Sequence, residues 1–181
     1  MKLHDAIDDR LREFIDAQHM FFVATAPGEG HVNVSPKGMN GTFAVLGTHR
    51  VAYLDYHGSG AETIAHLRDN GRITLMFCAF EGPPNIVRLY GTGRVVAVTD
   101  PEFAELLPVF DTPPDTHGAR SIIDVQVHRI SDSCGYAVPL MSYEGDRDLL
   151  LRWSSRRDEA ALADYRRAKN SASIDGLPAF G

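Results

Sequence analysis

The chain has few cysteines, no long apolar run and no excess of basic residues. Its two cysteines, Cys78 and Cys134, lie far apart without a CxxC pair or a disulfide framework, and each is expected to be a small buried hydrophobe. No run approaches the ~18 apolar residues of a membrane span, and the N-terminus lacks the apolar core of a secretion signal. We therefore expect a cytoplasmic protein with no membrane partner.

The formal charge of -6 argues against a nucleic acid partner. The densest basic stretch, Arg152–Lys169, is interleaved with acidic residues and is expected to be a solvated helix face. The eight histidines show neither HxH nor HxxxH spacing, which argues against a metal site. No GxSxG nucleophile elbow occurs, and Gly91-Thr-Gly93 lacks the third glycine of a dinucleotide fingerprint; it is expected to let a strand bend.

Length and composition indicate one domain, since 181 residues with 44% hydrophobic content can bury a single core. Alternation and β-rich runs predict six or seven short strands, in the runs Met20–Ala26, His31–Ser35, Thr42–Leu46, Arg50–Tyr56, Arg72–Phe80, Ile86–Val98 and Ser121–Ile130. Apolar spacing and capping residues predict helices at 5–17, at Ala61–Asn70, from Asp100 onward and at Glu159–Lys169. The stretch Phe110–Gly118 is expected to be a loop and the tail Ser171–Gly181 to be irregular.

Few of the predicted connections are long enough to hold a helix. A parallel α/β sheet needs a helix between most strand pairs, and only two of these connections could contain one. The pattern therefore favours a closed antiparallel barrel.

The turn Gly58-Ser-Gly60 lies between a predicted strand and a predicted helix. Free backbone N–H groups at a helix N-terminus, with hydroxyls at Ser59 and Thr63, would suit a phosphate. A plain turn with a serine cap is the alternative, and Glu62 favours it slightly because it already supplies negative charge to the helix start. His57 borders this turn and is the histidine of most interest.

Two basic residues could join that turn. Lys37 follows Ser35-Pro36 at a strand end, where it could converge on the glycine turn or serve as an exposed edge lysine. Arg88 lies within an apolar β run, so it must either point outward by alternation or find an anion. The sequence leaves both alternatives open.

Five segments together resemble the pyridoxamine 5'-phosphate oxidase-like superfamily, in its uncharacterised bacterial branch. They span about residues 18–98, with weaker likeness to Ile130, and are Phe22–Ala26, Val32–Gly38, Ala52–Gly60, Leu67–Phe77 and Arg88–Val96. The resemblance implies a mainly β fold: a six-stranded antiparallel split β-barrel with flanking helices. It further implies a homodimer that binds FMN in two clefts at the subunit interface. One domain would fill residues 1–181, with a barrel core at about 18–130 and a C-terminal helical extension at about 145–181.

The resemblance also assigns site residues. Those that would contact the flavin ring and ribityl chain lie on two neighbouring strands, and those near the phosphate lie at the turn or supply charge: Val34, Ser35, Lys37, Tyr53, Leu54, Asp55, Ser59, Gly60, Thr63 and Arg88. The segment Ser133–Pro139 resembles a feature of uncharacterised bacterial relatives and is expected to cover the cofactor.

Three departures argue against pyridoxamine 5'-phosphate oxidase activity itself. The vitamin-forming oxidases carry an Arg-Lys pair where this chain has Ser59 and Gly60, and an arginine where it has Val32. A C-terminal Arg-x-His substrate motif is also missing. Weaker FMN binding is therefore expected, with Lys37 and Arg88 supplying the charge.

The expected function is that of an FMN-dependent oxidoreductase that transfers hydride between an electron donor and a small-molecule substrate. No catalytic side chain is assigned, because the flavin carries this chemistry itself. One alternative is a deazaflavin-dependent reductase, although such relatives carry more basic residues for a polyglutamate tail than the charge of -6 suggests. Another is a non-catalytic protein that stores or senses flavin or binds haem.

Overall fold

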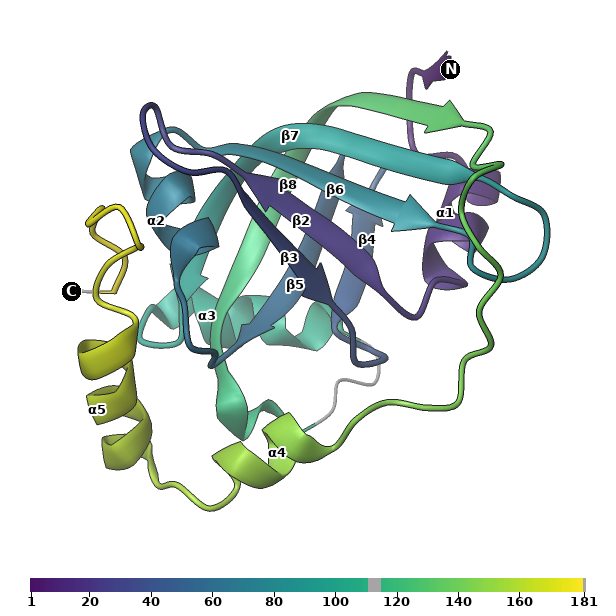
Figure 1. Cartoon of the computed structure of the whole chain (residues 1–181). Coiled ribbons are helices and arrows are strands. Elements are labelled where there is room, and N and C mark those ends of the chain that lie inside the picture. Colours follow the sequence, from purple (N-terminus) through teal and green to yellow (C-terminus); the bar gives the residue numbers. More distant parts are fainter. Residues whose placement is uncertain (111–114, 181) are drawn as a thin grey trace.

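One antiparallel sheet carries the fold in the computed structural model, which describes residues 1–110 and 115–180 (Figure 1). Within these residues the sheet has eight strands, in the order β3-β2-β6-β7-β8-β5-β4, with β1 paired to the end of β8. The strands are β1 Lys2–His4, β2 Phe21–Thr25, β3 Asn33–Lys37, β4 Phe43–Gly47, β5 Arg50–Tyr56, β6 Arg72–Cys78, β7 Ile86–Ala97 and β8 Ala119–Ser133.

Helices flank this sheet on several sides (Figure 1). They are α1 Asp9–Asp16, α2 Glu62–Asp69, α3 Pro101–Leu106, α4 Leu149–Ser154 and α5 Glu159–Lys169. Asp8 and Asp158 cap α1 and α5, because each side chain accepts a hydrogen bond from a backbone N–H of the first turn. No helix in the described part of the chain combines the length and apolar character needed to cross a bilayer.

The mainly β, antiparallel split-barrel prediction is confirmed, with two differences. The sheet has eight strands among the described residues rather than six, since β1 adds to the edge of β8 and β4 forms a hairpin with β5. The sheet is also open: among these residues its two end strands, β3 and β4, form no pair. The fully closed barrel that the strand pattern favours was therefore the wrong expectation. The sheet stays open, and the cleft described below lies beside its open edge.

The long strands β7 and β8 curve the sheet around its core. Their register shifts between Tyr90 and Gly91, and a Cβ on Gly91 would lie only 2.5 Å from the backbone oxygen of Gln126. Only glycine fits this close approach, which agrees with the predicted bend. The two hydrophobic clusters of the core lie on opposite faces of the sheet: one takes Val51 and Tyr53 of β5 with Leu11 and Ile15 of α1, and the other takes Ala52 and Leu54 of β5.

Several local predictions need correction. Cys78 is buried as expected, but Cys134 is exposed because it lies where the chain has already left β8. The basic stretch Arg152–Lys169 is not a single solvated face: it contains α4 and α5 and buries Leu162 completely. Of the expected loop Phe110–Gly118, residues 111–114 lie outside the described residues.

Candidate functional site

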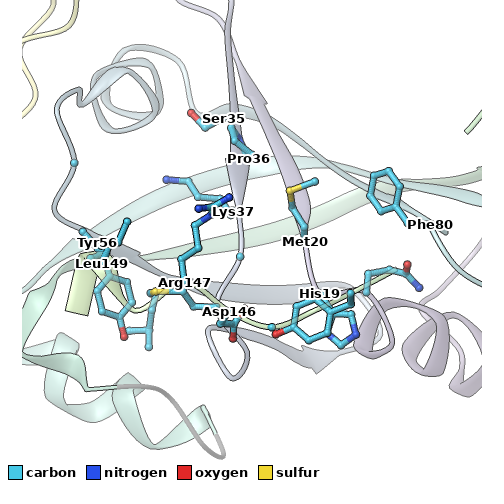
Figure 2. A pocket seen from close by; sticks show the side chains of 18 of the residues that line it. His19, Met20, Ser35, Pro36, Lys37, Tyr56, Phe80, Asp146, Arg147 and Leu149 are labelled. Carbon is cyan, nitrogen blue, oxygen red and sulfur yellow. The ribbon is translucent and has the colours of Figure 1, made fainter. Parts of the chain in front are cut away.

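A cleft of about 1330 Å³ lies beside the open edge of the sheet (Figure 2). The end of β3, the end of β5, the turn before α2 and the connection from α1 to β2 form its walls, together with the β6–β7 loop and part of the chain between β8 and α4. Figure 2 shows Lys37 and Arg147 toward one end of this space and Phe80 and His19 toward the other.

The cleft brings together six of the ten residues that the sequence singled out. They come from β3, β5, the glycine turn and α2, and they are Ser35, Lys37, Leu54, Ser59, Gly60 and Thr63. Residues 58–60 had been read either as a phosphate turn or as a plain turn. Their position in the wall of this cleft, with Lys37 in the same wall, favours the first interpretation.

The other four residues are not at the cleft surface. Val34 is 60% exposed because alternate residues of β3 point to opposite faces, away from its neighbours Ser35 and Lys37. Tyr53 is fully buried in the core. Arg88, on β7, pairs with Met76 of β6 and donates a hydrogen bond to Ser133 Oγ at 3.2 Å. This arrangement corresponds to the outward-pointing alternative.

Asp55, the fourth of these residues, lies just below the cleft as the centre of an ion cluster. Its side chain is almost completely buried, and its two oxygens accept hydrogen bonds from Lys37 Nζ and Arg120 Nε, both at 2.7 Å. Burial alone would raise the pKa of Asp55, but the two cations outweigh it and hold that pKa well below its usual value. Asp55 therefore stays ionised and fixes two cations in the cleft wall.

Arg120 is a site residue that the sequence analysis missed. Its second nitrogen, Nη1, donates to the backbone oxygen of Gly60 at 2.9 Å and to Asn170 Oδ1 at 2.8 Å. The available signal was an arginine beside an apolar β run, the same signal that drew attention to Arg88. Because β8 begins at Ala119, Arg120 lies inside the strand rather than before it.

The C-terminal part of the chain holds the glycine turn from behind. Asn170 is fully buried, and its Nδ2 donates to the backbone oxygen of Gly58 at 2.9 Å. Two carbonyls of the turn are thus directed toward the protein, at Gly58 and Gly60. Among the described residues, no group accepts a hydrogen bond from the backbone N–H of Ser59 or Gly60, so these donors are available to a ligand.

His57 connects the turn to α5. Its Nδ1 donates to the backbone oxygen of Gly118 at 2.8 Å, and its Nε2 accepts from Arg166 at 3.0 Å, a pattern that requires the neutral ring. Burial lowers the pKa of His57; the Gly118 contact opposes this, and the charges of Arg166 and Arg120 lower the pKa further. A neutral His57 therefore belongs to the folded state.

Residues 134–148, here called the crossing segment, run from β8 to α4 along the outside of the molecule (Figure 1). Tyr143 stacks on His19 with ring centroids 3.6 Å apart, and the backbone N–H of Met141 donates to the backbone oxygen of Phe80 at 2.9 Å. The expected cover over the cofactor was Ser133–Pro139. In this part of the chain the residues that line the cleft begin at Met141, so this wall of the cleft is formed by residues that follow Ser133–Pro139.

Comparison with known proteins agrees with this geometry. The open sheet and the cleft at its edge define a protein of the split-barrel class. The family model for pyridoxamine 5'-phosphate oxidase matches residues 7–134. The pyridoxamine 5'-phosphate oxidase family protein ustO of Aspergillus flavus is 38% identical, over 97% of this chain and 76% of its own length. The chain belongs to the pyridoxamine 5'-phosphate oxidase family.

Solved structures share the fold at low sequence identity. HupZ of Group A Streptococcus has a TM-score of 0.56 and 20% identity, covering 70% of this chain and 99% of its own. An FMN-binding protein from Syntrophomonas wolfei subsp. wolfei has a TM-score of 0.51 and 14% identity, covering 72% of this chain and 85% of its own. The family model ends at residue 134, so most of the crossing segment, α4 and α5 lie beyond it.

We predict that Asp55→Asn destabilises the protein by about 3–5 kcal/mol, because it leaves buried Arg120 and partly buried Lys37 without their counter-ion. Urea unfolding monitored by circular dichroism measures this loss. Asp16→Asn, at an exposed position in α1, is the matched control and should change stability by less than about 0.5 kcal/mol. A similarly small loss for both variants would contradict the role assigned to the ion cluster.

We also predict a pH-dependent contribution from His57. Because the folded protein lowers the pKa of His57 below 6.5, its contribution is complete above that pH and is lost as the pH falls. The difference in melting temperature between the wild type and His57→Gln should therefore shrink from about pH 8 to about pH 5. Exposed His128→Gln should show no such trend, and a constant difference for His57→Gln would refute the prediction.

Proposed function

We propose that this chain is an FMN-binding flavoprotein that transfers hydride between an electron donor and a small-molecule substrate. The observation that carries the proposal is the glycine turn: unpaired N–H groups of Ser59 and Gly60, at the start of α2, share a cleft wall with Lys37 and Arg120. Family membership and the fold shared with an FMN-binding protein support it.

The donor set fits a flavin phosphate. A phosphate group needs several convergent hydrogen-bond donors and positive charge, and this wall offers backbone N–H groups, the hydroxyls of Ser59 and Thr63, and two cations. Nothing lies within 4 Å of where a Cβ on Gly58 would be, so the turn is open on that side. The missing Arg-Lys pair is thus offset by Lys37 and Arg120 from other strands.

The size of the cleft suits two ligands rather than one. Its volume of about 1330 Å³ exceeds the ~300–1,000 Å³ of pockets that hold one drug-sized molecule. Apolar side chains of Met20, Leu54 and Phe80 also line the cleft, and they would exclude water from a flat ring. A cofactor and a small substrate could therefore occupy the cleft side by side.

In this proposal, the bound flavin supplies the hydride-transfer chemistry and the chain supplies binding and orientation. Asp55 stays ionised, because its pKa is held low. Tyr56, which lines the cleft, stays protonated, because burial and then the charge of Asp115 raise its pKa to about 12. Neither group is suited to proton transfer near neutral pH, so these side chains would position ligands rather than act as acid or base.

We include a homodimer and a single domain over residues 1–181 in the proposal. Val32 and Val34 on the hairpin of β3 are 71% and 60% exposed, and Leu140 on the crossing segment is 79% exposed. Apolar residues so exposed on two parts of the chain favour burial against a second copy.

Binding of FMN tests the proposal directly. Binding to the apoprotein should quench the fluorescence of added FMN. Lys37→Ala combined with Ser59→Ala should raise the Kd for FMN at least about tenfold, since each hydrogen bond to a charged group contributes roughly 1.5–3 kcal/mol. Lys2→Ala, at an exposed position of β1 outside the cleft lining, is the control and should leave the Kd unchanged. A wild-type protein that binds no FMN would refute the proposal.

Glu62 gives a prediction of opposite sign. Its carboxylate oxygen lies 2.3 Å from where a Cβ on Gly60 would be, so it stands beside the proposed phosphate site. Glu62→Gln removes a like charge there, which at an exposed helix N-terminus corresponds to roughly 0.3–1 kcal/mol or about two- to fivefold tighter FMN binding. Riboflavin, which lacks the phosphate, should bind the two proteins equally. Unchanged or weaker FMN binding would place the phosphate elsewhere.

A further inference from the structure

Asn33, at the start of β3, forms a polar network that none of the assignments above includes. Its side chain points to the same side of the strand as Ser35, because residues two apart in a strand share a face. Asn33 Nδ2 lies 3.2 Å from Thr63 Oγ1 and 3.2 Å from Ser35 Oγ, and Ser35 Oγ lies 3.3 Å from Asn33 Oδ1. Asn33 thus connects hydroxyls from two walls of the cleft.

The chemistry of these groups determines where their hydrogens go. An amide nitrogen only donates, whereas a hydroxyl donates one hydrogen and accepts others. Thr63 Oγ1 accepts a hydrogen from Asn33, so its own hydrogen is free for another acceptor. Ser35 Oγ lies 3.2 Å from the amide nitrogen and 3.3 Å from the amide oxygen of Asn33, so it can accept a hydrogen bond from the one or donate to the other.

The buried neighbours of Asn33 do not compete strongly with Thr63 for the hydrogen bonds that the Asn33 amide nitrogen donates. Thr25 Oγ1 is 3.5 Å from Asn33 Nδ2, and that hydroxyl already lies 3.0 Å from Nδ1 of the fully buried His66. The shorter contact of the amide is with Thr63, which is itself 7% exposed and lines the cleft in the first turn of α2.

We propose that Asn33 is a positioning residue that orients the hydroxyl of Thr63. Because its amide nitrogen donates to Thr63 Oγ1, the hydrogen of Thr63 is left to donate to an anionic phosphate. The ligand class is therefore a phosphorylated one, as in FMN, and Asn33 contributes to selection of the phosphorylated over the unphosphorylated flavin. This inference rests on the proposed function.

The experiment compares FMN with riboflavin, titrated into apoprotein under identical conditions. Asn33→Asp keeps the shape of the side chain but can only accept, so it would take the hydrogen of Thr63 and add a negative charge. Its Kd for FMN should rise at least about tenfold, while its Kd for riboflavin stays within about twofold of the wild type. A general structural defect would weaken both ligands alike.

A double-mutant cycle removes the effect of the added charge. Asn33→Leu and Thr63→Val should each weaken FMN binding, and the double variant should bind FMN no more weakly than Thr63→Val alone, because Asn33 acts through Thr63. Ser35→Ala should weaken FMN and riboflavin equally, since both carry the same polyol chain. Melting temperatures within a few degrees of the wild type show that the variants are folded.

The outcomes are distinct. An unchanged ratio of FMN to riboflavin affinity in Asn33→Asp, or losses that multiply in the Asn33→Leu and Thr63→Val cycle, would overturn the inference while FMN binding by the wild type still stands. A wild type that binds neither flavin would overturn both this inference and the proposed function.

Discussion

The cleft depends on one buried carboxylate, that of Asp55. Among the described residues the sheet is open between β3 at one end and the β4–β5 hairpin at the other, so no strand pairing joins these edges. The ion pair from Lys37 on β3 to Asp55 on β5 spans that opening, and Arg120 on β8 adds a second cation to the same carboxylate. Because breaking a buried pair leaves an uncompensated charge, this cluster ties the two edges more firmly than surface ion pairs would.

Arg120 extends the influence of this cluster to the glycine turn and the C-terminal part of the chain. The same guanidinium that pairs with Asp55 binds the backbone oxygen of Gly60 and the side chain of Asn170. Asn170 directly follows α5, beyond the region that the family model matches. The shape of the turn is therefore set partly by Asn170, which lies beyond the region that the family model matches.

Much of the fold could be predicted because its signals are local. Alternation along β3 and β8, β-rich runs along β2, β5 and β7, and glycine or proline near their ends mark strands directly. The cleft lining includes Lys37, Ser59 and Thr63, which belong to short local motifs. Residues assigned in unbroken runs do not all face the cleft, since alternation turns Val34 away from Ser35. Asn170 carries no local signal, and the signal of Arg120, an arginine in an apolar β run, does not identify its partners, because only the folded chain brings these residues together.

The balance of charge in the cleft explains why hydrogen-bond geometry matters there. Lys37 and Arg120 share the negative charge of Asp55, so the cluster carries one net positive charge, and Glu62 opposes it beside the turn. A dianionic phosphate in such a place gains less from charge than it would beside an Arg-Lys pair. Its binding must then rely on neutral donors, the N–H groups of the turn and the hydroxyls of Ser59 and Thr63. A hydroxyl can donate to an anion only if its hydrogen is not already bonded to another acceptor. The residue that orients the hydroxyl is therefore as important as the hydroxyl itself.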